Sequence, residues 1–178
     1  MKYFVKIVYI IYAIIFLIYL GLPNLNFPEP PTDSLMSNEP GDIENPSIRS
    51  YFTDYSREDI ISHYKKGFSK NSILGIPMPT FVLNYPPEEA KIIIKQQTRS
   101  TFLQEIVHPL RESIFINGFE AKEEKDTIFI NNKIWKYKIN VKLVSSNILN
   151  RFVIGSLTLL LIPLLVLQWI KTFNYSKK

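Results

Sequence analysis

The chain has 178 residues, of which 46% are hydrophobic, and a formal net charge of +5 at pH 7. This length accommodates one modest domain, because single domains typically need roughly 100 to 200 residues. The chain contains no cysteine, which excludes disulfides, thiolate metal sites and a lipid-modified N-terminal cysteine.

Residues 1–22 contain two early lysines, Lys2 and Lys6, followed by an uncharged apolar run from Ile7 to Leu22. We expect a transmembrane helix that acts as an uncleaved signal anchor, with the lysine ammonium groups near the lipid headgroups. A cleavable signal peptide is the alternative, since it also combines a basic start with an apolar stretch. The run is long for a signal peptide, and no pair of small residues precedes a plausible cleavage site.

A second apolar segment at residues 151–171 predicts another transmembrane helix. It carries no charge from Phe152 to Ile170, and at ~1.5 Å per residue this run matches the roughly 30 Å hydrocarbon core of a bilayer. A buried helix of a soluble protein is the alternative, but such helices are rarely apolar on all sides. Gly155 permits close approach of the first helix, whose aromatic residues share one face: Tyr9, Tyr12, Phe16 and Tyr19.

The charge distribution predicts the topology. Residues 23–150 are nearly neutral, because they hold all 16 acidic residues and most of the basic ones. The basic excess flanks the apolar segments, which is the positive-inside pattern and not the basic face of a nucleic-acid-binding protein. We therefore expect both termini, including a basic tail at residues 172–178, to be cytoplasmic and residues 23–150 to be extracytoplasmic. We expect no nucleic-acid partner.

Residues 23–50 predict a tether between the first apolar segment and a folded domain. Six of the 12 prolines of the chain lie here, together with five acidic residues and a single basic one. This composition favours an extended, poorly ordered segment, because it offers little apolar surface to bury. A proline-rich ligand for a partner protein is the alternative interpretation.

We expect residues 51–147 to form a small α+β domain with an antiparallel sheet and two or three helices. Ser56 is a candidate N-cap for a short amphipathic helix that ends near Gly67. Alternating residues at 81–85, bounded by prolines, predict a strand. The whole chain is thus predicted to be a membrane-anchored α+β protein, with two transmembrane helices flanking this domain.

A long helix is predicted from Pro87 to the residue before Pro109, since proline suits a first helical turn and disfavours helix just before it. At 100° per residue, Gln96 and Arg99 fall on the apolar face of this helix. A charge thus interrupts an apolar stripe, and the interruption needs an explanation.

Three explanations remain open for Arg99. The helix breaks near Thr98 and its halves bury different sides, or Arg99 forms an ion pair with a carboxylate such as that of Glu112. In the third, a pocket binds an anionic ligand or partner, because the arginine fork suits carboxylate and phosphate. The residues predicted to line that pocket are Gln96, Arg99, His108 and Arg111.

Three strand-like runs follow residue 112. Asn131-Asn132 suits a two-residue hairpin turn, since asparagine tolerates positive φ, and this turn places Ile128 opposite Trp135. The last strand then alternates, with Trp135, Tyr137, Ile139, Val141 and Leu143 on one face.

Lys136, Lys138 and Lys142 lie on the opposite face of this last strand. The simplest interpretation is a solvated face or protection of a sheet edge. Because the strand ends close to Arg151, the alternative is contact with anionic headgroups, each lysine contributing on the order of 1 kcal/mol.

The sequence contains no recognisable catalytic signature, and its two histidines, His63 and His108, lie far apart. We therefore lean against an enzyme and expect no cofactor and no metal. The favoured function is a two-pass envelope protein that presents an extracytoplasmic domain for interaction with a membrane or envelope protein. The alternative is an extracytoplasmic sensor or binding domain for an anionic small molecule or lipid headgroup.

Overall fold

The computed structural model describes residues 2–70, 72–73, 76–95 and 97–175. The chain divides into two compact units. One, called the helix pair below, consists of Met1–Asn24 and Ser146–Lys178, and the other, called the domain, is Leu25–Ser145. The fold class is α+β, as predicted from the sequence.

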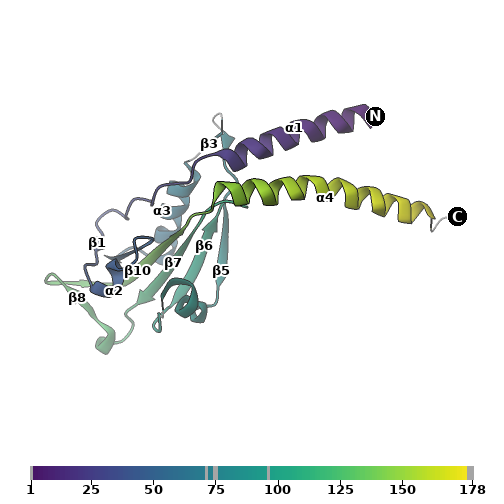
Figure 1. The fold of residues 1–178 in the computed structure, drawn as a ribbon. Coiled ribbons are helices and arrows are strands. Elements are labelled where there is room, and N and C mark those ends of the chain that lie inside the picture. The colour runs from purple at the N-terminus through teal and green to yellow at the C-terminus, as the bar shows by residue number, and fades with distance from the viewer. Residues whose placement is uncertain (1, 71, 74–75, 96, 176–178) are drawn as a thin grey trace. The chain divides into compact units, whose positions relative to one another are not determined.

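The helix pair contains α1 (Lys2–Gly21) and α4 (Ile148–Tyr175), the purple and yellow-green helices of Figure 1. Both are long and apolar enough to cross a membrane. The hydroxyl of Tyr9 donates a hydrogen bond to the carbonyl of Leu159, and Gly155 lies against Leu20 and Phe16. Tyr9 and Phe16 of the aromatic face of α1 thus lie against α4, whereas Tyr12 on the same face is 56% exposed.

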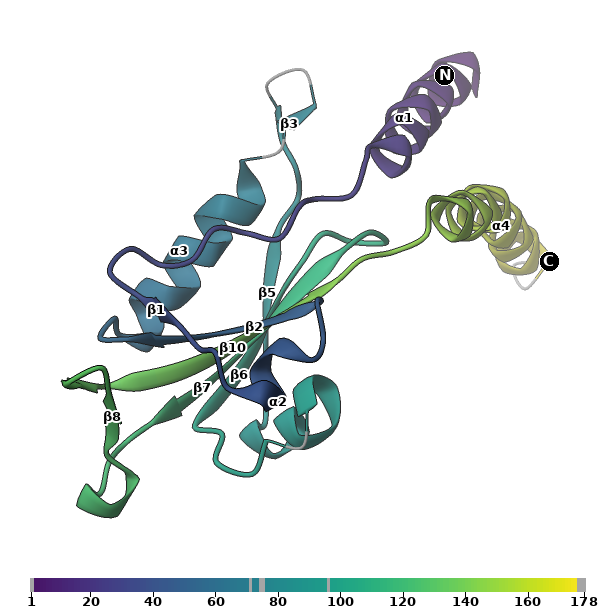
Figure 2. The same ribbon diagram turned by 60° about the vertical axis from the view of Figure 1, so that its left-hand side comes forward.

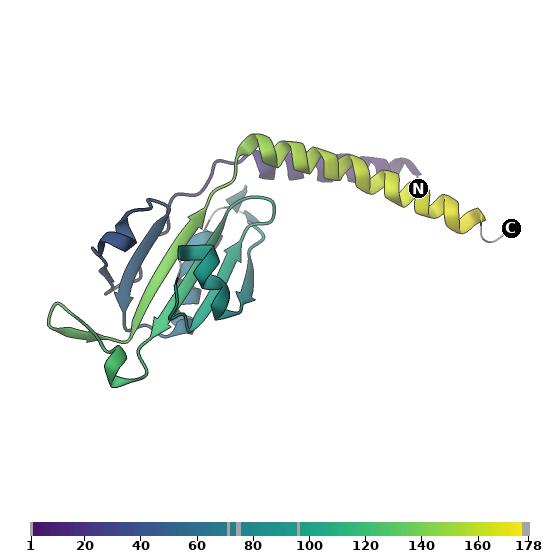
Figure 3. The same ribbon diagram turned by 60° about the horizontal axis from the view of Figure 1, so that its bottom comes forward.

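The domain is built on a six-stranded antiparallel sheet with the order β1-β2-β10-β7-β6-β5. Its strands are β1 (Leu35–Met36), β2 (Ile48–Thr53), β10 (Tyr137–Val144), β7 (Ser113–Glu120), β6 (Phe102–Val107) and β5 (Phe81–Tyr85). Two hairpins form separate small sheets: β3 (Ser72–Ile73) with β4 (Ile76–Pro77), and β8 (Ile128–Ile130) with β9 (Lys133–Trp135). Figure 3 shows the β8 hairpin projecting beyond the main sheet.

Apolar side chains pack on both faces of the main sheet. Helix α3 (Arg57–Ser69) covers one face with Ile60, Tyr64 and Phe68. On the other face, Ala90 and Ile94 pack from the segment of η1 (Pro87–Glu89) and η2 (Lys91–Lys95). Figure 2 shows α3 on one side of the sheet and the short helix α2 (Pro40–Ile43) on the other. The last short helix, η3 (Glu124–Asp126), precedes β8.

Several elements follow the local sequence signals. The Ser56 hydroxyl accepts a hydrogen bond from the backbone N–H of Asp59 at 3.2 Å, which caps α3 as predicted. The β8–β9 hairpin turns at Asn131 and Asn132, whose φ angles are 52° and 59°. It pairs Ile128 with Trp135, so the predicted turn and register are confirmed.

The predicted helix from Pro87 to residue 108 is wrong over its second half. The helical turns η1 and η2 cover Pro87–Glu89 and Lys91–Lys95, no helix is assigned at residues 97–101, and Phe102–Val107 forms β6. This strand pairs with β5 on one side and with β7 on the other. Because both sheet faces are covered, apolar residues at neighbouring positions of β6 are both buried, which removes the alternation that identifies half-exposed strands.

The segment predicted to be a tether carries ordered elements. Residues 35–53 include β1, α2 and β2, and Leu25 and Phe27 pack against the core on the α3 face. Ser37 and Asp42 are buried, and the Ser37 hydroxyl donates to the Asp42 carboxylate at 2.6 Å. Pairing with β2 and a few buried residues thus order a segment whose composition favours disorder.

Candidate functional site

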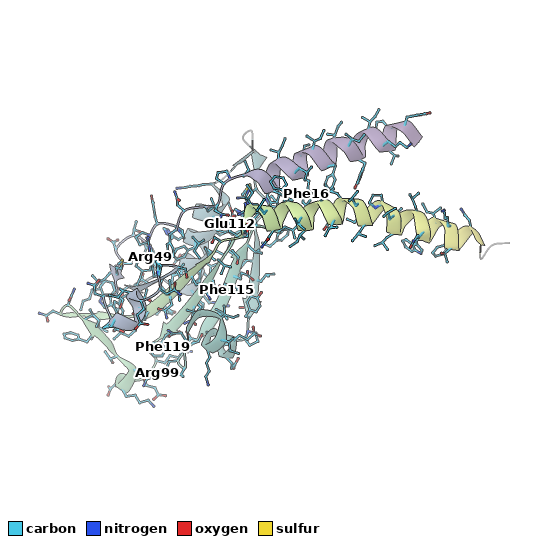
Figure 4. All side chains as sticks on the ribbon, in the orientation of Figure 1. Phe16, Arg49, Arg99, Glu112, Phe115 and Phe119 are labelled. Atoms are coloured by element: carbon cyan, nitrogen blue, oxygen red, sulfur yellow. The ribbon has the colours of Figure 1, made fainter. Side chains whose placement is uncertain are left out.

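The structure does not bring the predicted pocket residues together. Gln96 lies outside the described residues. Arg99 precedes β6 whereas His108 and Arg111 follow it, so a strand of roughly 20 Å at about 3.3 Å per residue separates them. Figure 4 shows Arg99 and Glu112, which follows Arg111, at opposite ends of the domain. The two ends of β6 are therefore separate environments.

His108, Arg111 and Glu112 form a buried cluster in the turn between β6 and β7. His108 Nε2 lies 3.1 Å from Thr80 Oγ1, and His108 Nδ1 lies 3.4 Å from Glu112 Oε1. Arg111 Nη2 donates to Glu112 Oε1 at 2.9 Å. The side chains of His108 and Glu112 are 0% exposed, so a ligand in solvent cannot reach them. These contacts stabilise the turn at residues 108–112, in which Leu110 has a φ of 59°.

Arg99 lines a cavity of about 450 Å³ on the sheet face opposite α3. The floor of this cavity comes from β2, β10 and β7, where Phe52, Lys138 and Phe119 are cross-strand neighbours. Asn140 and Asn117 form the next cross-strand pair of the floor. Residues 97–99 and 125–130 supply the walls, and Figure 4 shows Arg99 close to Phe119. We call this space the Arg99 cavity.

Every lysine and arginine that lines the Arg99 cavity has a carboxylate partner. The pairs are Arg99–Asp126 (3.1 Å), Lys125–Glu123 (2.6 Å), Lys138–Glu39 (2.7 Å) and Lys138–Asp42 (2.8 Å). An ion pair of Arg99 with a carboxylate such as that of Glu112 was one of the three explanations left open by the sequence. The structure contains an ion pair of Arg99, but its partner is Asp126, and Glu112 pairs with Arg111. An anionic ligand would have to compete with these carboxylates for the cations.

Lys138 and Asp42 stay charged at neutral pH although the protein partly buries them. Burial alone would raise the pKa of Asp42, but hydrogen bonds from Lys138 and Ser37 outweigh it and leave the pKa lowered. Burial likewise opposes the charge of Lys138, and its hydrogen bonds to Asp42 and Glu39 outweigh that effect and raise its pKa. The pair thus joins α2 to the floor of the cavity.

The predicted membrane-facing lysines take different positions. Lys138 belongs to the ion pairs of the cavity, and Lys142 Nζ donates to the carbonyl of Ile93 at 2.6 Å. Lys136 is exposed, with its Nζ 5.3 Å from the centre of the Tyr137 ring. The covering of this sheet face by α2 and η2 explains why two of the three lysines have partners inside the domain.

Sequence reasoning missed the two asparagines of the cavity floor. Asn140 is 3% exposed, and its Oδ1 atom has no hydrogen-bond partner among the described residues. Asn117 is also buried and accepts a hydrogen bond from the Ser100 hydroxyl. The signal in the sequence is an uncharged polar residue between Lys138 and Lys142, but recognising its role requires the pairing of β10 with β7.

No group of three histidine, cysteine or acidic residues that could hold a metal ion is found among the residues described. Comparisons of the chain with models of protein families, with curated proteins and with solved structures found no match. The functional proposal therefore stands on the residues of this chain alone.

Proposed function

We propose that this chain is an integral membrane protein whose helices α1 and α4 both cross the bilayer. The supporting observation is their exposure within the helix pair. Only 11% of the most apolar 18-residue stretch of α1 is buried, and only 6% of the corresponding stretch of α4. The core helix of a soluble protein, in contrast, is mostly buried. Apolar side chains on nearly all sides of two long helices are compatible with lipid and costly in water.

Arg151 supports the proposal that both helices end on the same side of the membrane. It is 2% exposed and donates to the Leu22 carbonyl at 3.0 Å, beyond the end of α1. It also donates to the Ser146 hydroxyl at 2.6 Å, before the start of α4. A helix that ends and a helix that begins at one guanidinium run antiparallel, so the two chain termini share a side. The terminal lysines favour the cytoplasm for that side.

The domain then lies outside the cytoplasm, where we propose that it binds a membrane or envelope protein. The projecting β8–β9 hairpin supports this role. Its cross-strand neighbours Phe129 and Ile134 are 60% and 63% exposed. A solvent-exposed apolar pair on a projecting hairpin is costly in water and is satisfied by the surface of a partner protein.

The topology is tested by cysteine labelling, because the chain has no cysteine of its own. We expect Lys122→Cys to react in intact cells with a maleimide that does not cross membranes, since Lys122 is 71% exposed. Asn174→Cys, near the end of α4, should react only after the cells are permeabilised. Labelling of Asn174→Cys in intact cells would overturn the proposed topology.

Partner binding is tested by co-purification from membranes in mild detergent. We expect Phe129→Asp to remove a stoichiometric partner that the unmodified chain retains. Ile43→Asp is the matched control, because Ile43 is 57% exposed and lies on α2, away from the hairpin in sequence. Equal loss of the partner in both variants would argue against the hairpin as the binding surface.

A ligand-binding function is the second candidate, and the Arg99 cavity supports it. The unpartnered Oδ1 of buried Asn140 at the cavity floor suits a ligand that donates a hydrogen bond. If the ligand is anionic, Asp126→Asn should strengthen binding of inorganic phosphate, because it removes the carboxylate that competes for Arg99. Calorimetric titration with phosphate measures the change in affinity. If neither the unmodified chain nor Asp126→Asn binds phosphate, the cavity is not a simple anion site.

A further inference from the structure

Strand β5 lies at one edge of the main sheet and leaves apolar side chains exposed. It pairs with β6 on one side, and no described strand pairs with its other side. Phe81, Val82 and Leu83 are 55%, 37% and 43% exposed. The backbone N–H and C=O groups on the free side of an edge strand are available to another strand.

The two edges of the sheet differ in how well they are protected against pairing with a strand of another chain. Strand β1 at the opposite edge has only two residues, and very short edge strands resist pairing with other chains. Strand β5 has five residues in unbroken register with β6, so it contains no bulge, and it contains no charged residue. Pro79 and Pro86, just outside the strand, limit the length over which another strand can pair.

We propose that β5 pairs antiparallel with β5 of a second copy of this chain, about a twofold axis that passes Leu83. The strand reads Phe-Val-Leu-Asn-Tyr, so this axis places Leu83 opposite itself and Phe81 opposite Tyr85 of the second copy. Both strands end at the same prolines, so the paired lengths match. No like charges meet, which is the usual obstacle to self-pairing of a strand.

Side chains on one face of β5 strengthen this pairing. Tyr85 is held in place, since its hydroxyl donates to Glu105 Oε2 at 2.7 Å and its ring lies 5.9 Å from that of Phe115. Phe81 and Leu83 lie on the same face as Tyr85 because residues two apart in a strand share a face. Two copies therefore bring together four aromatic rings and two leucines, which also removes their exposed surface from water.

Anchoring adds to the association, and this point alone depends on the proposed membrane location. Two chains that are confined to one membrane meet at a far higher effective concentration than two chains in solution. The strand pairing itself depends only on the domain. Cysteine labelling of Lys122→Cys and Asn174→Cys tests the location separately, so failure of one proposal is distinguishable from failure of the other.

The test is a disulfide cross-link in the full-length chain, which has no other cysteine. Directly opposed residues of antiparallel strands have Cα atoms about 4.5–5.5 Å apart, which is within the range for a disulfide. We expect mild oxidation of Leu83→Cys in membranes to give a dimer of twice the 20.8 kDa chain on a non-reducing gel. Thermal unfolding followed by circular dichroism checks that the variant is folded.

Phe81→Cys is the matched control, because it lies on the same strand and face and is more exposed. In the proposed register, residue 81 of one copy lies opposite residue 85 of the other. The two residues at position 81 are therefore four positions apart along the strand direction, or about 13 Å, which is too far for a disulfide. We expect roughly tenfold less cross-linking of Phe81→Cys alone, and recovery of the cross-link when Phe81→Cys and Tyr85→Cys chains are mixed.

Three outcomes would overturn the proposal. Leu83→Cys gives no dimer, or it cross-links no better than Phe81→Cys, or its product has the mass of this chain joined to a different protein. The last result would assign the edge to a strand of another partner. As an independent measurement, Leu83→Lys should leave circular dichroism unchanged and convert the purified chain to a monomer in sedimentation.

Discussion

A Cβ atom on Gly155 of α4 would lie 2.2 Å from Leu20 Cδ1 of α1, closer than two carbon atoms can approach. Phe16 Cε1 lies 3.3 Å from the same position, so two side chains of α1 fill the space that the glycine leaves. Small residues allow helices to approach closely, and the resulting van der Waals packing is one of the contributions that hold helices together in lipid, where the hydrophobic effect contributes little.

Gly155→Leu should therefore separate the helices at this point. We expect the free energy of unfolding of the helix pair to fall by about 1–3 kcal/mol, the usual cost of overpacking a tight contact. Titration of the detergent-solubilised chain with sodium dodecyl sulfate measures the shift in midpoint. Ser156→Leu is the control, since Ser156 is exposed, and an equal shift for both variants would contradict a specific contact at Gly155.

Arg151 provides the second prediction for the helix pair. Its guanidinium bonds the carbonyls of Leu20 and Leu22 and both the hydroxyl and the carbonyl of Ser146. Arg151→Ala removes donors from the buried Leu20 carbonyl and the part-buried Leu22 carbonyl, whereas the Ser146 carbonyl keeps a hydrogen bond from Asn24 Nδ2 at 3.1 Å. The change should cost about 2–4 kcal/mol, since a hydrogen bond to a charged group contributes about 1.5–3 kcal/mol and water reaches part of the site. Arg151→Lys keeps the charge but not the planar fork, and should restore only part of the loss.

Proteolysis near residues 22–24 measures the effect at the site itself. We expect faster cleavage of the chain in nanodiscs for Arg151→Ala than for Arg151→Lys, because the connection after α1 loses its anchor. If both variants resist protease like the unmodified chain, Arg151 does not hold the ends of the two helices together.

The ion pair of Asp42 and Lys138 predicts an acid-dependent part of the stability of the domain. The folded-state pKa of Asp42 is lowered from 3.8, so its contribution is present above that value and is lost as the pH falls through the lowered pKa. Asp42→Asn should remove this part of the pH dependence and cost about 1–3 kcal/mol at pH 7, between the values for exposed and buried pairs. Urea unfolding at pH 7 and pH 3 measures both effects.

Asp54→Asn is the matched control for this ion pair. Asp54 lies 2.6 Å from Lys133, but both side chains are about half exposed. Water screens such a pair, so its loss at pH 7 should cost less than about 1 kcal/mol. If Asp54→Asn destabilises the domain as much as Asp42→Asn does, burial does not strengthen the Asp42–Lys138 pair.

The elements that depend only on neighbouring residues could be predicted from the sequence. The cap at Ser56 and the turn at Asn131-Asn132 follow from side-chain chemistry within a few positions. The helices α1 and α4 follow from long uncharged runs. Strand β6 was missed because Phe102 and Leu103 are both buried, on opposite faces, and only the coverage of both faces explains that pattern.

The candidate site was less predictable, because it depends on strand register. Asn140 and Asn117 are 23 positions apart in sequence numbering and become neighbours only through the pairing of β10 with β7. The pairing of Arg99 with Asp126 rather than Glu112 likewise follows from β6 being a strand, which carries residue 112 to the far end of the sheet. A helix over the same residues would have kept them closer.

Gly118 and Phe102 provide the last prediction, because they are cross-strand neighbours of β7 and β6. A Cβ atom on Gly118 would lie 2.0 Å from Phe102 Cε1, so the ring occupies the space of the absent side chain. Gly118→Ala should displace this buried ring and cost about 1–3 kcal/mol in urea unfolding of the full chain.

Gly67→Ala is the opposite control, because nothing lies within 4 Å of its Cβ position in α3. It should stabilise the chain by about 0.5–1 kcal/mol, and a loss of stability there would show that the effect at Gly118 is not specific to the ring.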